Sequence, residues 1–236
     1  MFIRHKTLTP DSIAFRKKIF AVLSVLLVST FSCSHVPDIY ITGLTDPDNI
    51  PEKCHSVFPD DDWRFVHSIE ATLPGGNTAF MLGVTKISPK NRTIWAVMMT
   101  LEGLVLFDAF FDGKMVINRA IPPFDSEFFA QGLMEDIRLI FFHPENTAVE
   151  IGLSGTGEPT CRYHSHENMI TDVVIGQNGS LTVNRYHQYR LHRTVRLYRG
   201  EKQKHPSIFQ RLELIAPKPA EYEMDLYLLE AEPLTK

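Results

Sequence analysis

The sequence lacks long apolar runs, internal repeats and low-complexity tracts. Its N-terminal apolar run, residues 19–28, falls short of the roughly 20 apolar residues that a membrane-spanning helix needs. The absence of a fixed period argues against solenoids and coiled coils, and the absence of biased tracts argues against long disordered regions. With 236 residues, of which 44% are hydrophobic, the chain is long enough for one sizeable domain with its own core.

Positive charge is scarce after the first residues. Residues 1–32 hold five basic residues and one acidic residue, which leaves 19 basic and 27 acidic residues, a formal charge of −8, in the rest of the chain. That balance is poor for binding the phosphate backbone of nucleic acid. We therefore expect no nucleic-acid partner.

The apolar run near the N-terminus follows a basic cluster. Arg16-Lys17-Lys18 precedes the run, and the mostly small and polar residues 29–32 separate it from Cys33. This order of basic, apolar and small residues is typical of an export signal. Residues 1–32 are therefore predicted to be a signal peptide.

Ser32-Cys33 resembles the lipobox of bacterial lipoproteins, in which a Cys after a small residue is diacylated and becomes the new N-terminus. The resemblance implies a lipid anchor on Cys33, and ordinary cleavage or an uncleaved anchor are the alternatives. Ser34 after the Cys resembles lipoproteins that are sorted to the outer membrane. The expected location is the periplasmic face of the bacterial outer membrane.

Two further cysteines, Cys54 and Cys161, are an even pair in what would be an oxidising periplasm. They are either a disulfide or two separate buried thiols, because the sequence does not fix the distance between their Cα atoms. His164 and His166 would point the same way from a strand, as metal ligands do, but the spacing implies no third ligand. We expect no metal, no cofactor and no enzymatic activity.

The residues that follow Cys33 divide into a lead-in and a β-rich domain. Residues 33–62 are rich in Pro and Asp without a sustained period, which predicts a lipidated N-terminus and tether. Residues 63–236 contain about ten short runs of strand-like alternation, and Asp112-Gly113 and Asn178-Gly179 have the composition of tight hairpin turns.

One helix interrupts the predicted strands. Asp125 or Ser126 can cap its start, and His143-Pro144 ends it, because the residue before a proline avoids the helical conformation. Apolar residues recur at four-residue steps along it, at Phe129, Leu133, Ile137 and Phe141. This face must be buried, either as a plug or lid over a hydrophobic cavity or as an ordinary core helix.

Five arginines make the late strand segment locally basic: Arg185, Arg190, Arg193, Arg196 and Arg199. They either pair with acids of neighbouring strands or meet anionic lipid headgroups. Arg193 shares a face with apolar residues, so it must reach an acid or a polar cavity wall.

Short strands around one internal helix predict a mainly β chain with a strongly curved antiparallel sheet or an open β-barrel. Five short segments carry a resemblance to a family of proteobacterial lipoproteins of unknown function: Leu82-Gly83, 104–113, Pro122-Pro123, 134–144 and Tyr189-Arg190-Leu191. The arrangement also resembles the lipoprotein carrier LolA and its outer-membrane acceptor LolB. That fold implies an open barrel with helices in its mouth and an apolar cavity for acyl chains.

The sequence therefore predicts a membrane-anchored lipoprotein that binds a lipid, an acyl chain or another hydrophobic ligand, with a role in outer-membrane lipid or lipoprotein transport. The residues expected to line the cavity are Phe80, Leu82, Trp95, Leu106, Phe129, Leu133 and Phe141. An apolar pocket holds a lipid tail through burial of its surface. The alternative is a structural or assembly lipoprotein that acts through a protein partner in the cell envelope.

Overall fold

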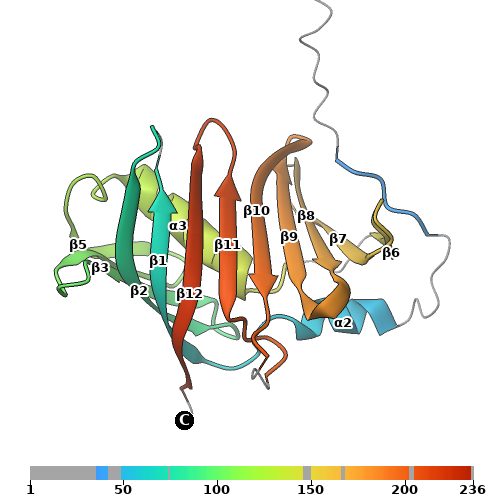
Figure 1. The fold of residues 1–236 in the computed structure, drawn as a ribbon, viewed down its shortest axis with the longest axis horizontal. Helices are drawn as coiled ribbons and strands as arrows, with labels where there is room; N and C mark the ends of the chain where they lie inside the picture. Colours follow the sequence, from blue (N-terminus) through green and yellow to red (C-terminus); the bar gives the residue numbers. More distant parts are fainter. Residues whose placement is uncertain are drawn as a thin grey trace, which may run out of the picture. The chain divides into compact units, whose positions relative to one another are not determined.

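Twelve strands form one sheet in the computed structural model, which describes residues 36–41, 49–73, 75–145, 150–165, 168–201 and 205–234. The strands are β1 (Trp63–Thr72), β2 (Thr78–Ser88), β3 (Thr93–Met99), β4 (Val105–Phe111), β5 (Met115–Ala120), β6 (Glu150–Leu153), β7 (Pro159–Ser165), β8 (Met169–Ile175), β9 (Leu181–His187), β10 (Arg190–Tyr198), β11 (Arg211–Ala216) and β12 (Tyr222–Pro233). The helices are α2 (Ile50–Ser56), α3 (Glu127–Phe141) and the short 3-10 helix η3 (Gln177–Gly179), as shown in Figure 1.

All described residues belong to the second of the two compact units into which the chain divides, residues 1–35 and residues 36–236. The predicted signal peptide and Cys33 lie outside the described residues. Among the described residues, no helix has the length and apolar character needed to cross a membrane.

The sheet is antiparallel and open. Its strand order is β5-β4-β3-β2-β1-β12-β11-β10-β9-β8-β7-β6, so β5 and β6 are the outer strands of the part of the chain described here. Consecutive strands are neighbours in the sheet except β5 and β6, and the pairing of β1 with β12 joins its two halves. The predicted turns Asp112-Gly113 and Asn178-Gly179 connect the hairpins β4–β5 and β8–β9. The predicted fold class is confirmed.

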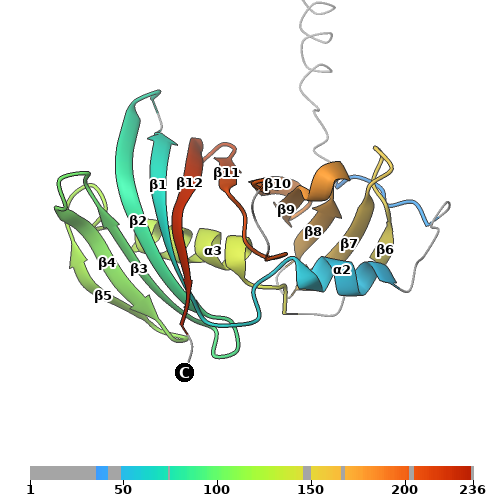
Figure 2. The same cartoon turned by 60° about the horizontal axis from the view of Figure 1, so that its bottom comes forward.

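The predicted central helix is α3, between the two halves of the sheet in the sequence. The Ser126 hydroxyl caps its start by accepting a hydrogen bond from the Phe129 backbone N–H at 3.1 Å. The helix ends just before His143-Pro144, as expected. Figures 1 and 2 show that α3 crosses one face of the curved sheet. We call this face the inner face, and the opposite one the outer face.

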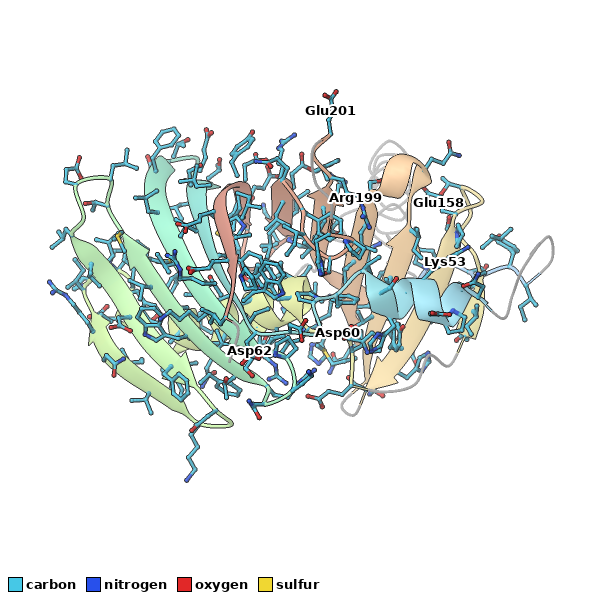
Figure 3. All side chains as sticks on the ribbon, turned by 90° about the horizontal axis from the view of Figure 1, so that it is seen from below. Lys53, Asp60, Asp62, Glu158, Arg199 and Glu201 are labelled. Atoms are coloured by element: carbon cyan, nitrogen blue, oxygen red, sulfur yellow. A yellow bond between two sulfur atoms is a disulfide. The ribbon has the colours of Figure 1, made fainter. Side chains whose placement is uncertain are left out.

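The segment before β1 is more ordered than the sequence suggests. Within the predicted tether, α2 packs on β7 and β8 and buries Ile50 and Cys54. A disulfide joins Cys54 to Cys161 of β7, so of the two alternatives the structure has the bonded pair. A helix of seven residues has too few turns to show a period in the sequence. Figure 3 labels Lys53 on the outside of α2, and Asp60 and Asp62, which follow the helix.

The residues from Val36 also pack on the sheet. Tyr40 pairs with Leu153 of β6 in an antiparallel bridge, and Val36 is buried with Ile170 and Tyr186 on the outer face. Gly152 permits this approach, because a Cβ at that position would lie 2.6 Å from the Tyr40 carbonyl oxygen. Part of the segment expected to be a tether is therefore bound to the sheet.

Candidate functional site

The inner face is apolar on the side of β1 and β4, where it meets the aromatic residues of α3. The rings of Phe65 in β1 and Phe141 in α3 stack with centroids 4.7 Å apart. Phe107 in β4 and Phe129 in α3 meet edge to face at 5.5 Å. Such aromatic pairs add attraction beyond the area that they bury. They fix α3 against the sheet along most of its length.

The space between α3 and the sheet is filled by these side chains. A cavity of about 10 Å³ adjoins the end of α3 and is lined in part by Phe65, Phe141 and Leu197. A volume of this size is about what one water molecule needs. A hydrocarbon chain can therefore enter only if α3 moves away from the sheet.

Three of the seven residues predicted to line a cavity are on the face of α3 that packs against the sheet: Phe129, Leu133 and Phe141. Phe80, Leu82 and Trp95 lie on the outer face, and Leu106 is the extra residue of a β-bulge in β4. Successive side chains of a strand point to opposite faces, and Phe80 and Leu82 flank the buried Met81. Phe80, Leu82 and Trp95 do not line the space under α3.

Contacts on the outer face show the position of Trp95. Its indole N–H donates to Asp108 Oδ1 at 2.9 Å, and the ammonium group of Lys86 lies 4.6 Å from the ring centroid. Phe80, on the same face, is 59% exposed. Tyr227 and Leu229 of β12 are also exposed on this face, on the other side of β1. We call Phe80, Tyr227 and Leu229, together with the half-buried Leu82, the exposed apolar patch.

A buried polar cluster holds the middle of α3 to the other half of the sheet. Arg193 of β10 donates through Nε to Asp136 Oδ1 of α3 at 2.9 Å, and both residues are buried. The Tyr222 hydroxyl of β12 donates to the other oxygen of the same carboxylate. The prediction that Arg193 must reach an acid is confirmed. The acid itself was not predicted, although an Asp between the apolar residues of an amphipathic helix was a usable signal.

Burial raises the pKa of the Asp136 carboxyl, and Arg193 and the Tyr222 hydroxyl oppose that rise because they stabilise the carboxylate. Burial, followed by the charge of Asp136, also raises the pKa of Tyr222. The Tyr222 hydroxyl therefore keeps its proton near neutral pH and donates a hydrogen bond to the carboxylate. The three side chains form one hydrogen-bonded unit between helix and sheet.

Arg185 of β9 and His192 of β10 lie beside this unit. Arg185 is the direct cross-strand partner of Arg193, and the pairing of β9 with β10 shifts between Leu191 and Arg193, so His192 is the extra residue of a β-bulge. The His192 ring lies within 3.4 Å of Arg193 Nη1. By contrast, Arg196 points to the outer face and pairs with Glu213 at 3.4 Å. The predicted basic strand is thus divided between the two faces.

The buried ring of His67 also faces α3, with its centroid 6.3 Å from that of Phe141. Burial lowers the pKa of His67 to about 4. An unfolded chain takes up a proton on this ring near pH 6.5, whereas the folded chain does not until about pH 4. Stability therefore rises with pH across this window and is lost as the pH falls through it.

We expect acidification from pH 6.5 to about 4 to remove roughly 3 kcal/mol of stability through His67 alone. Urea unfolding at a series of pH values gives the free energy of unfolding of the wild type and of His67→Leu. The contribution of His67 is the change with pH in the difference between these two free energies. His187→Gln, which alters an exposed histidine, is the control and should follow the wild type. Parallel curves for His67→Leu and the wild type would contradict the assignment.

A second cavity, of about 180 Å³, lies on the outer face of β7, β8 and β9. At its base Arg162 donates to both oxygens of Asp172, at 2.7 and 2.8 Å. The same guanidinium donates to the Pro37 carbonyl at 2.6 Å, and Glu158, labelled in Figure 3, lies at the edge. Pro37, Asp38 and Ile39 of the N-terminal segment form one wall of this cavity.

The ligand-rich segment after Cys161 forms no metal site in the part of the structure that is described. Cys161 is bonded to Cys54, and His164 Nε2 lies 3.4 Å from Glu150 Oε1. His166 lies outside the described residues. Among the residues that are described, no group of three or more His, Cys, Asp or Glu side chains is arranged to hold a metal ion.

No family model matches the sequence, and no curated protein matches it either. Several solved structures are similar to this one at low sequence identity. A LolA superfamily protein from Nitrosomonas europaea is 11% identical, with a TM-score of 0.50 over 80% of this chain and 94% of that chain. A DUF1329 family protein from Desulfovibrio piger is 8% identical, with a TM-score of 0.47 over 79% and 91% of the two chains. An outer membrane lipoprotein-sorting protein domain from Vibrio parahaemolyticus is 9% identical, with a TM-score of 0.44 over 79% and 92%. The chain has a LolA-like fold.

Proposed function

We propose that this protein binds the hydrocarbon chain of a lipid or another amphiphile between α3 and the inner face of the sheet, without covalent chemistry. Helix α3 is the displaceable cover of this site. Phe129 and Phe141 pack against Phe107 and Phe65 of the sheet, and the ligand chain would take the place of these two rings. Movement of α3 would exchange these rings for an acyl chain and keep the apolar surface of the sheet out of water.

One observation carries this proposal. Helix α3 packs its aromatic face against the inner face of an open sheet, and a buried ion pair of Asp136 and Arg193 holds its middle. A buried ion pair contributes less stability than an apolar contact of the same volume, so it is weak evidence for a purely structural role. A buried ion pair suits a contact that must form in only one position of the helix.

We further propose that the protein is exported and anchored by a lipid on Cys33 to the periplasmic face of the outer membrane. The N-terminal order of basic, apolar and small residues supports export. The disulfide between Cys54 and Cys161 supports an oxidising compartment. Metabolic labelling with a palmitate analogue tests the anchor, because the wild-type chain should incorporate label and Cys33→Ser should not.

Binding is testable with two photoreactive amphiphiles that share a palmitoyl chain bearing a diazirine, one with a neutral glycerol head and one with a phosphate head. We expect at least one of them to label the purified full chain on α3 or on the inner-face residues of β1 and β4. Phe129→Ala should increase this labelling several-fold, because it removes one ring that fills the site and weakens the hold on α3.

Phe80→Ala is the matched control, since it removes the same ring from the outer face. Its labelling should equal that of the wild type. The proposal is refuted if neither amphiphile labels the inner face, or if Phe80→Ala and Phe129→Ala change labelling equally.

The exposed apolar patch of the outer face favours a second candidate, a structural or assembly lipoprotein with an envelope protein as its partner. Phe80 on β2 and Tyr227 and Leu229 on β12 are 59%, 43% and 60% exposed on the two strands that flank β1, and patches of exposed apolar surface mark interaction sites. Crosslinking in cells should then recover one dominant envelope protein. Tyr227→Ser should abolish that crosslink, whereas Phe129→Ala should not affect it.

A further inference from the structure

We propose that Arg185, His192 and Arg193 form a polar subsite of the inner face that binds the anionic headgroup of the amphiphile. This inference rests on the proposed function, because the headgroup takes its place only when the hydrocarbon chain lies under α3. It narrows the ligand from any hydrophobic molecule to an amphiphile that carries a phosphate or a carboxylate.

The first support is the direct opposition of two arginines. Arg185 and Arg193 are cross-strand partners on β9 and β10, a position in which like charges repel each other. Asp136 bonds to Arg193, but Arg185 Nε is buried and has no hydrogen-bond acceptor among the described residues. The pair therefore has more buried donors than acceptors to receive them.

The β-bulge adds a third nitrogen-bearing side chain at the same place. His192 is the extra residue of β10 and lies against Arg193, and bulges commonly redirect side chains at functional sites. Its Nδ1 is also buried without a hydrogen-bond partner in the part of the chain described here. Arg185 Nε and His192 Nδ1 are thus two buried nitrogens without partners on adjacent strands. They indicate an acceptor that the described part of the protein does not supply.

The second support follows from the movement that ligand entry requires. When α3 leaves the sheet, Glu135 and Asp136 leave with it, so Arg193 loses the carboxylate to which it donates and Arg185 loses the two carboxylates whose charges act on it. Loss of one partner of a buried ion pair is strongly unfavourable. A phosphate or carboxylate on the ligand would replace Asp136, because the guanidinium group presents a fork of donors that matches both anions. A neutral headgroup offers no such replacement.

The position of the subsite suits an amphiphile. The aromatic contacts of α3 lie at β1 and β4, whereas the arginines lie on β10 and β9, beyond β12 and β11 in the same sheet. Tyr222 of β12 stands between them and bonds to the carboxylate that the headgroup would replace. A hydrocarbon chain on the aromatic side therefore places its head on the arginine side.

The experiment compares the two palmitoyl amphiphiles on the full chain, with inorganic phosphate as a competitor. We expect the phosphate-headed amphiphile to label the inner face at about one tenth of the concentration that the glycerol-headed one requires, since one charge-assisted hydrogen bond is worth roughly a factor of ten. Inorganic phosphate in excess should reduce this preference only slightly if the site recognises a headgroup together with its chain. Strong binding of phosphate alone would assign the subsite to a free anion and overturn the headgroup assignment.

Arg185→Gln should remove most of the preference for the phosphate head, measured as the ratio of labelling by the two amphiphiles. Arg196→Gln is the matched control, since it removes an arginine of the same segment from the outer face, and it should retain the preference. Equal labelling by the two amphiphiles in the wild type would overturn the subsite and leave the proposed function intact. Absence of inner-face labelling by both would refute the proposed function and the subsite with it.

Discussion

Arg193→Met is expected to lower the free energy of unfolding by about 3–5 kcal/mol. The substitution removes the guanidinium group that donates to Asp136 and leaves a buried carboxylate with the Tyr222 hydroxyl as its remaining donor. Part of this loss can be relieved if Asp136 takes up a proton, and removal of Arg193 raises its pKa further. A folded-state pKa above the unfolded one means that stability falls as pH rises, so the loss should be greater in mild alkali than in mild acid.

Urea unfolding monitored by circular dichroism measures this effect. The double variant Asp136→Leu/Arg193→Met should recover most of the stability, because an apolar pair of similar volume can replace a buried ion pair at little cost. Arg196→Met removes an exposed arginine from the same strand and should change stability by less than about 1 kcal/mol. If Arg193→Met behaved like Arg196→Met, the buried cluster would not hold α3.

Local patterns in the sequence were sufficient to predict the strands and α3, but not α2 or which face of each strand is buried. In β2, Phe80 and Leu82 alternate with Met81 and Gly83, and both sets are compatible with burial. The choice is made by residues far away in the sequence, because Ile69 of β1 occupies the space beside Gly83, 2.7 Å from where a Cβ would be. The larger side chains, Phe80 and Leu82, were predicted to face the interior, and the structure places them on the outer face.

Of the buried ion pair, the sequence allowed the arginine to be predicted but not its acidic partner. Arg193 stood out because its strand neighbours on the same face are apolar, so an unpaired charge there would be costly. Its partner Asp136 lies 57 residues earlier, and no local pattern relates the two positions. The opposition of Arg185 to Arg193 depends on the bulge at His192, which shifts the pairing by one residue and is not visible in the alternation.

The other large effect concerns the disulfide. Removal of Cys54–Cys161 by the double substitution to Ala should lower the free energy of unfolding by about 4–5 kcal/mol, because the bond closes a loop of 107 residues in the unfolded chain. Both cysteines are fully buried, and the bond joins α2 to β7. Since α2 has only seven residues and would not be stable alone in water, its attachment should weaken more than the rest of the fold.

Hydrogen exchange separates the loss of overall stability from the weaker attachment of α2. Amides of β7 and β8 that α2 covers should lose protection in the double variant well before those of β1 and β12, because opening of α2 no longer requires the bond to break. Reduction of the wild type under native conditions should give the same pattern, slowly, because the sulfurs are shielded from solvent. Uniform loss of protection across the sheet would mean that α2 and its disulfide stabilise the whole fold as one unit, and that the segment before β1 is no less integral to it than the strands.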